Sequence, residues 1–422
     1  MKDINSAGDS FPFVLTDVGG TLFFAADDGT HGFELWKSDG TRAGTVLVRD
    51  INPERNSNPD FLTDVGGTLF FGANDGIHGY ELWKSDGTTA GTVLVRDINP
   101  NGGSFDRRVF GSLVEVGGTL FFIADDGTHG IELWKSDGTE AGTVLVKDVR
   151  PDAERWVPGV LTDVGGTLFF APNDGTHGSE LWKSDGTEAG TVMVEDINPG
   201  GSSSSNLVDA TELGGTLFFI ADDGTHGFEL WKSDGTEAGT FLVKDIDAGG
   251  GRFPRGLTDV GGTLFFAADD GTHGFELWKS DGTEAGTVLV TDINPEGNSN
   301  PDFLTDVGGT LFFGANDGIH GKELWRSDGT GTGTVLVRDI NPDGRSNLRF
   351  LTDLGGELFF GADDGIRGKD LWRSDGTEAG TVLVRDINRD SDSFPSFLTD
   401  VGGTLFFGAD DGIHGFELWR AR

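Results

Sequence analysis

The feature that constrains this chain most is a tryptophan that returns at a nearly constant interval. The Trp of Glu-Leu-Trp, or of Asp-Leu-Trp in one copy, stands at positions 36, 83, 134, 182, 231, 278, 325, 372 and 419. The intervals between these positions are 47, 51, 48, 49, 47, 47, 47 and 47 residues. Nine copies at such a period predict one repeat architecture rather than a series of unrelated domains.

Each repeat contains four β-like runs, which we name A, B, C and D, separated by turn signals. In the copy at 61–99 these runs read FLTDV, TLFFGA, ELWKS and TVLVRDI, and the turns between them are Gly66-Gly67, Asn74-Asp75-Gly76 and Asp86-Gly87. Gly-Gly and Asp-Gly favour tight hairpin turns because these turns need positive φ. The apolar runs LFF and VLV are typical of strands buried on both faces. The pattern therefore predicts the four-stranded antiparallel blade of a β-propeller.

The two ends of the chain look like complementary parts of one repeat. The last copy stops at ELWRAR, just after run C, and the chain begins with MKDIN, which matches the end of run D in other copies. We therefore predict an all-β fold, a single nine-bladed β-propeller over 1–422, in which residues 1–5 join three C-terminal strands. Two smaller rings, or a ring completed between chains, are the alternatives. The blades are expected at 6–52, 53–99, 100–150, 151–198, 199–247, 248–294, 295–341, 342–388 and 389–422.

One segment of the repeat resembles a known family signature. ELWKSDGTEAGT at 229–240 is similar to the signature of the bacterial ELWxxDGT repeat family, and the likeness recurs over essentially the whole chain. Asp370 replaces the Glu in one copy, and the ninth copy ends before DGT. The resemblance implies a bacterial surface or secreted protein, and it carries no chemistry over to this chain.

Composition narrows the classes of partner. The formal net charge of −39 argues against nucleic-acid or anionic-membrane partners. The absence of Cys excludes disulfides and thiol chemistry. No apolar run approaches the roughly 18 residues of a membrane-spanning helix, so we expect no membrane insertion. The start of the chain has no signal-peptide pattern, so an export signal would lie outside it. We expect a monomer, extracellular or on the cell surface of a bacterium.

Most polar residues of the repeat stand in every copy, which favours a role in the scaffold over a unique active site. All eight histidines and Arg367 occupy the same B–C turn. Equivalent blades lie too far apart for these histidines to share a zinc ion at ligand distances of about 2 Å, so a turn hydrogen bond is expected. The paired Asp or Asn-Asp residues of this turn make calcium a candidate cofactor, against plain turn chemistry. Run A carries a further acid, which could line a central channel or bond the Gly-Gly turn: Asp17, Asp64, Glu115, Asp163, Glu212, Asp259, Asp306, Asp353 and Asp400.

The spacers between run D and the next run A vary most, so the ligand site is predicted there. Three spacers bring basic and aromatic residues into an acidic surface, which suits stacking on sugars or gripping carboxylates. The predicted function is a non-enzymatic binding scaffold for a protein or glycan, with no catalytic residues. A glycan-processing enzyme, or a structural ring stabilised by calcium, are the alternatives. The predicted ligand contacts are Arg107, Arg108, Arg155, Trp156, Arg252 and Arg255.

Overall fold

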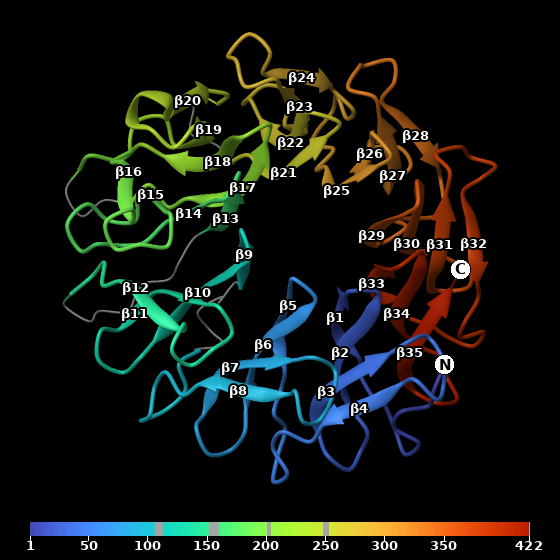
Figure 1. Cartoon of the computed structure of the whole chain (residues 1–422). Coiled ribbons are helices and arrows are strands. Elements are labelled where there is room, and N and C mark those ends of the chain that lie inside the picture. The colour runs from blue at the N-terminus through green and yellow to red at the C-terminus, as the bar shows by residue number, and fades with distance from the viewer. Residues whose placement is uncertain (106–112, 152–159, 201–203, 248–252, 422) are drawn as a thin grey trace. The chain divides into compact units, whose positions relative to one another are not determined.

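The strands of this protein form nine antiparallel sheets, one for each repeat (Figure 1). The computed structural model describes residues 1–105, 113–151, 160–200, 204–247 and 253–421. Eight sheets have four strands in sequence order, and the ninth has three within the described residues. The predicted fold class, an all-β nine-bladed β-propeller, is confirmed. No helix within the described ranges has the length and hydropathy of a membrane span.

The chain divides into two compact units, which we describe separately. Unit 1 comprises 1–193, 399–409 and 413–422, and unit 2 comprises 194–398 and 410–412. Most of the first four sheets belongs to unit 1: β1 (Phe13–Val18), β2 (Thr21–Asp27), β3 (Phe33–Ser38) and β4 (Val46–Arg49); β5 (Asp60–Val65), β6 (Thr68–Asn74), β7 (Tyr80–Ser85) and β8 (Val93–Arg96); β9 (Val114–Val116), β10 (Thr119–Asp125), β11 (Ile131–Ser136) and β12 (Val144–Lys147); β13 (Leu161–Val164), β14 (Thr167–Phe170), β15 (Leu181–Ser184) and β16 (Val192–Glu195).

Unit 2 holds the next four sheets, and the last sheet follows them in the sequence. The unit 2 elements are β17 (Val208–Leu213), β18 (Thr216–Asp222), β19 (Phe228–Ser233), the 3-10 helix η1 (Glu237–Gly239) and β20 (Phe241–Lys244); β21 (Arg255–Val260), β22 (Thr263–Asp269), β23 (Phe275–Ser280) and β24 (Val288–Thr291); β25 (Asp302–Val307), β26 (Thr310–Asn316), β27 (Lys322–Ser327) and β28 (Val335–Arg338); β29 (Arg349–Leu354), β30 (Glu357–Asp363), β31 (Lys369–Ser374) and β32 (Val382–Arg385). The ninth sheet consists of β33 (Ser396–Val401), β34 (Thr404–Asp410) and β35 (Phe416–Ala421).

The Gly-Gly turn between the first two strands shows why the repeat needs its glycines. Gly19 and Gly20 have φ of 57° and 84°, where a side chain would be strained. The backbone N–H of Gly20 donates to Asp17 Oδ1 at 2.8 Å. The same bond joins Gly67 to Asp64 at 2.7 Å. The recurring acid of run A is therefore a turn-stabilising group, as one of the two interpretations predicted.

The Ser-Asp-Gly-Thr segment forms the hairpin after the tryptophan. Asp39 Oδ1 accepts hydrogen bonds from the backbone N–H of Thr41 at 2.8 Å and from its hydroxyl at 2.7 Å. Ser38 Oγ accepts from Gly40 N at 3.0 Å and pairs with Thr45 Oγ1 at 2.8 Å. These bonds satisfy the polar groups of the turn internally, so the segment is scaffold rather than a catalytic motif.

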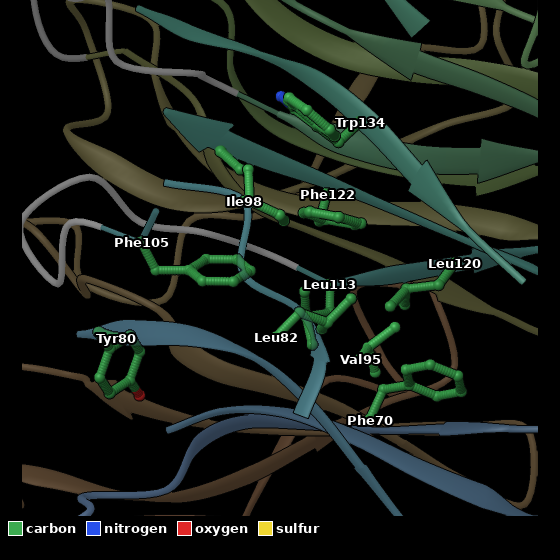
Figure 2. Close-up of a cluster of buried hydrophobic side chains, with 11 residues drawn as sticks. Phe70, Tyr80, Leu82, Val95, Ile98, Phe105, Leu113, Leu120, Phe122 and Trp134 are labelled. Atoms are coloured by element: carbon green, nitrogen blue, oxygen red, sulfur yellow. The ribbon is translucent and has the colours of Figure 1, made fainter. Parts of the chain in front are cut away.

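Within each unit, apolar clusters fill the space between consecutive sheets. Figure 2 shows one of them, in which Phe70 and Leu82 of the second sheet meet Phe122 and Trp134 of the third. The central phenylalanine of the second strand is fully buried in each sheet, as Phe71 and Phe313 illustrate. The expected burial of run B on both faces is therefore correct, and each blade is stabilised by its neighbours.

Residues 1–5 contact C-terminal strand residues that belong to unit 1. The backbone N–H groups of Ile4 and Asn5 donate to the Glu417 carboxylate at 2.9 and 3.4 Å. Ile4 packs with Phe406 and Leu418 in one core cluster. In the first blade, the residues of run D that pair with run C are Val46, Leu47 and Arg49, and only Lys2 corresponds to any of these. The N-terminal residues therefore lie at the predicted place, but within the described part of the chain none of residues 1–5 is assigned to a strand.

Candidate functional site

The glutamate of Glu-Leu-Trp anchors the spacer that leads to the next blade. Glu34 is buried in β3 and accepts from Ile51 N and Ser57 N at 2.9 Å each and from Ser57 Oγ at 2.6 Å. Burial raises the pKa of Glu34 to about 7, although these hydrogen bonds act to lower it. One carboxylate therefore fixes both ends of the segment 51–57.

The B–C turn that follows this spacer contains a histidine held by an aspartate. In the second blade, His78 Nδ1 lies 2.7 Å from Asp75 Oδ2, and the backbone N–H of His78 donates to Asp75 Oδ1 at 2.8 Å. Burial acts to raise the pKa of Asp75, but the hydrogen bonds from His78 and Ile77 outweigh it and lower that pKa. The hydrogen bond to Asp75 raises the pKa of His78. The predicted turn-stabilising bond of this histidine is confirmed.

The spacer and the turn line an open pocket of about 500 Å³ in unit 1. Asn56 Oδ1 accepts from Phe33 N at 3.1 Å, and Asn74 Oδ1 accepts from Gly76 N at 2.7 Å, so both amides are held in place. Asn58 lies at a φ of 47°, and its carbonyl accepts from the Tyr80 hydroxyl at 3.0 Å. We name this site the amide pocket, and it is lined by Asn52, Arg55, Asn56, Asn58, Asn74, Gly76 and Gly79.

Gly76 shows how closely the two walls of the amide pocket approach each other. Its φ is 80°, and a Cβ at this position would lie 3.0 Å from Asn52 Oδ1 of the opposite wall. A side chain there would be strained and would also push on the amide. The glycine is therefore needed both by the turn and by the shape of the pocket.

Of the predicted ligand contacts, the structure places only Arg255. It begins β21 in unit 2, and its guanidinium lies 4.3 Å from the centroid of the Phe275 ring. This contact occupies the arginine with a neighbour of its own unit, and Arg255 is not among the residues that line the amide pocket described above. Arg107, Arg108, Arg155, Trp156 and Arg252 lie outside the described residues.

The sequence did not lead us to the amide pocket, because the prediction followed the spacers that depart from the common pattern. The pocket lies on a common spacer, INPERNSNPD, and the available signal was the density of asparagines in it. The anchoring glutamate also had a signal, since a serine follows it after 23 residues, as in the pair of Glu34 and Ser57.

No described group of three or more His, Cys, Asp or Glu residues could hold a metal ion. Calcium in the B–C turns therefore stays a prediction.

No family model and no curated protein matches this sequence. Among solved structures, puromycin hydrolase is similar at 14% identity and a TM-score of 0.37, covering 83% of this chain and 58% of the hydrolase. A puromycin-hydrolyzing peptidase of Mycobacterium tuberculosis is similar at 12% identity and a TM-score of 0.40, with coverage of 83% and 57%. Prolyl oligopeptidase B from Galerina marginata is similar at 11% identity and a TM-score of 0.45, with coverage of 84% and 55%. The chain thus spans little more than half the length of these proteins.

These comparisons correct the predicted function. The similar structures are propeller domains of peptidases, so the prediction of a non-enzymatic binding scaffold is wrong and is not kept. At these identities the likeness concerns the fold, and it shows neither that this chain is an enzyme nor that it is not. The resemblance to the ELWxxDGT repeat family stays a prediction.

Proposed function

We propose that this propeller belongs to a glycan-processing enzyme and that the amide pocket holds a sugar of its substrate. The observation that carries the proposal is the lining of the pocket, which consists of asparagine, arginine and glycine. Its lining residues, within the described part of the chain, include no carboxylate and no large apolar side chain. Such a surface suits a neutral ligand with many hydroxyl groups.

The chemistry of the amide group supports a sugar as the ligand. An asparagine side chain presents one acceptor oxygen and two N–H donors, so one amide can donate to one hydroxyl and accept from its neighbour. The oxygens of Asn56 and Asn74 are already engaged by backbone N–H groups. Their NH₂ groups can therefore serve as donors, and Arg55 adds further donors at the exposed edge of the pocket.

The histidine of the adjoining turn supplies an acid–base group for this proposal. His78 lies in sequence between the lining residues Gly76 and Gly79, and its side chain is 36% exposed. Asp75 engages Nδ1, which leaves Nε2 to exchange a proton with a substrate. We assign proton transfer to His78 and substrate holding to the asparagines.

The chain offers a matched control for the binding part of the proposal. The segment 293–321 repeats the segment 51–79 except that Gly297 stands in place of Arg55. In a glycan panel read by calorimetry, Arg55→Gly should weaken sugar binding about tenfold, the loss expected of one charge-assisted hydrogen bond. Gly297→Arg should create a second site of similar affinity. Equal binding by the wild type and both variants, or no binding of any glycan, would contradict the proposal.

A second pair of variants tests the acid–base assignment. Oligosaccharides that bind are incubated with the protein, and their products are measured by chromatography. His78→Asn should lower turnover by about 10²-fold or more while binding is retained. His320→Asn removes the equivalent histidine of the seventh blade, whose spacer has Gly297 in place of Arg55, and should leave turnover unchanged. Binding without any product, or an equal loss in both variants, would refute the catalytic role of His78.

A further inference from the structure

Cationic side chains bridge the seams between neighbouring blades in a regular way. Lys147, the last residue of β12, donates through Nζ to the carbonyl of Thr191 at 2.8 Å and lies 5.6 Å from the centroid of the Trp182 ring. Lys244, the last residue of β20, makes the same two contacts with Thr287 and Trp278 at 2.8 and 5.8 Å. Four further seams place a cation in the same way, with Lys2, Arg49, Arg96 and Arg338.

Each of these cations therefore meets the same cage. A carbonyl oxygen accepts one of its N–H groups, and the face of an indole ring attracts its charge. The Thr residue that offers the carbonyl closes the C–D turn of the next blade, and the Trp lies beside it in run C. The cage belongs to the repeat itself, so it is present whether or not a cation is supplied.

One seam carries an anion at the place of the cation. Glu195 is the last residue of β16, where Lys147 and Lys244 stand in their own strands. The following blade supplies Trp231 and Thr240, the counterparts of Trp278 and Thr287. Burial, and then the charges of Glu237 and Asp196, raise the pKa of Glu195. We name Glu195, Trp231, Glu237 and Thr240 the Glu195 seam, and all four residues belong to unit 2.

The seams without a cation are also more open. Thr45, Thr92, Thr143, Thr191, Thr287 and Thr381 face a cation and have 0% exposure, whereas Thr240 is 8% exposed. Thr334 is 7% exposed, and its seam has the neutral Thr291 in place of the cation. The missing stem of a lysine or arginine explains the opening in both cases, because such stems cover the surface beneath them.

We propose that the Glu195 seam is a binding site for an alkylammonium group from outside the chain. The carbonyl of Thr240 and the face of Trp231 repeat the cage that holds an ammonium or guanidinium in six other seams. The carboxylate of Glu195 stands where the other seams have a cation or a neutral residue, and Glu237 adds a second negative charge close to it. The ligand is a primary amine on a flexible alkyl stem, which is the chemistry of the lysine side chain that the seam lacks.

The same residues disfavour calcium, neutral alkyl groups and anions as ligands. Calcium takes six to eight oxygen ligands, whereas one wall of this cage is an indole ring. A neutral alkyl group would gain nothing from the two carboxylates, and an anion would be repelled by them. The two sources of an alkylammonium, a small free amine and a lysine side chain of a peptide, share this chemistry and are separated by the test.

The test follows the indole ¹H–¹⁵N signals of Trp231 and Trp325 in the intact protein. The probes are n-butylammonium, N-acetyl-lysine-N-methylamide, 1-pentanol and Mg²⁺. We expect n-butylammonium to shift the Trp231 signal saturably and to leave Trp325, beside the neutral Thr291, about tenfold less sensitive. A matching response to the lysine derivative identifies a lysine side chain as a source, and a response to n-butylammonium alone identifies a small free amine. 1-Pentanol and Mg²⁺ should have no effect on Trp231.

Two variants provide the controls. Glu195→Lys places the chain's own ammonium in the cage, as Lys147 and Lys244 do, so it should fold and should abolish the Trp231 response. Thr291→Lys fills the neutral seam and should leave the Trp231 response unchanged. The proposal is overturned if Glu195→Lys still binds the amine, if 1-pentanol or Mg²⁺ produces the same shift, or if Trp231 and Trp325 respond alike.

Discussion

The second and seventh blades contain the same stretch of sequence in two surroundings. Residues 51–79 and 293–321 differ only at Arg55 and Gly297, and the next residue is Tyr80 in one blade and Lys322 in the other. The backbone agrees at the left-handed positions, since Asn58 and Asn300 adopt φ of 47° and 46°, and Phe61 and Phe303 adopt φ of 56° and 54°. The shared residues thus set the fold of both blades, whereas single substitutions at their edges set the surface chemistry.

The position after the shared stretch shows how large that difference is. Tyr80 is 7% exposed, packs edge-on against Phe105 and donates to the carbonyl of Asn58. Lys322 forms an ion pair with Asp302 instead. Burial raises the pKa of Asp302, although Lys322 acts to lower it. One blade therefore extends its apolar core at this place, and the other builds a charged pair.

The largest effect is expected when the same buried phenylalanine is truncated in the second and in the seventh blade, which tests whether their cores are packed equivalently. Phe71→Ala and Phe313→Ala should each lower the free energy of unfolding by about 3–5 kcal/mol, because both rings are fully buried. Urea unfolding followed by circular dichroism measures the loss. A difference of more than about 1 kcal/mol between the variants would show that the shared sequence does not give equivalent packing.

The two blades can also be compared by how the free energy of unfolding depends on pH, through the anchoring glutamates Glu81 and Glu323. Burial is the main cause that raises the pKa of Glu81 and of Glu323 to about 7, from an ordinary 4.5. The folded state therefore holds more protons than the unfolded state between these values, and the free energy of unfolding falls as the pH rises through this window. The fall should amount to up to about 3 kcal/mol for each group and should level off above it.

Urea unfolding between pH 4.5 and 8 checks this expectation. Glu81→Gln and Glu323→Gln should each make the fall with pH smaller, and by similar amounts. Glu54→Gln, at an exposed position of the spacer, is the control and should leave the pH profile unchanged. A rise in stability over the same window would contradict the sign of both pKa shifts.

The last prediction, with the weakest effect on stability, concerns the first position after the shared stretch, which is Tyr80 in the second blade and Lys322 in the seventh. Tyr80→Phe removes the hydrogen bond to Asn58 and should cost about 1 kcal/mol, with little dependence on salt. Lys322→Met breaks the partly exposed ion pair with Asp302 and should cost about 0.5–1 kcal/mol in dilute buffer. High salt should reduce the second loss, and unfolding at two salt concentrations measures it. An equal response to salt would remove the distinction between the two blades.

The fold was predictable because the same turn residues and apolar runs occur in nine copies of the repeat. Positive φ at Gly19-Gly20 and the buried run around Phe71 follow directly from residue type and pattern. The role of Asp17 was left between two interpretations, and only the distance to Gly20 N decided between them. The amide pocket was missed because its asparagines belong to a spacer that looked ordinary.

The repeat pattern alone was enough to predict the number of blades, their four strands and the scaffold role of the repeated Trp and Ser-Asp-Gly-Thr. These properties follow from short-range chemistry, namely turn preferences and the burial of apolar runs. The side chains that meet across a seam, by contrast, could be identified only from the packing of the blades. The cage around Glu195 is built from residues of neighbouring blades, since Glu195 and Thr240 are 45 residues apart in the sequence. The amide pocket joins Asn52 to a turn 24 residues further on, at Gly76. A local sequence pattern does not reveal such contacts, because they form only when segments far apart in the sequence pack against each other.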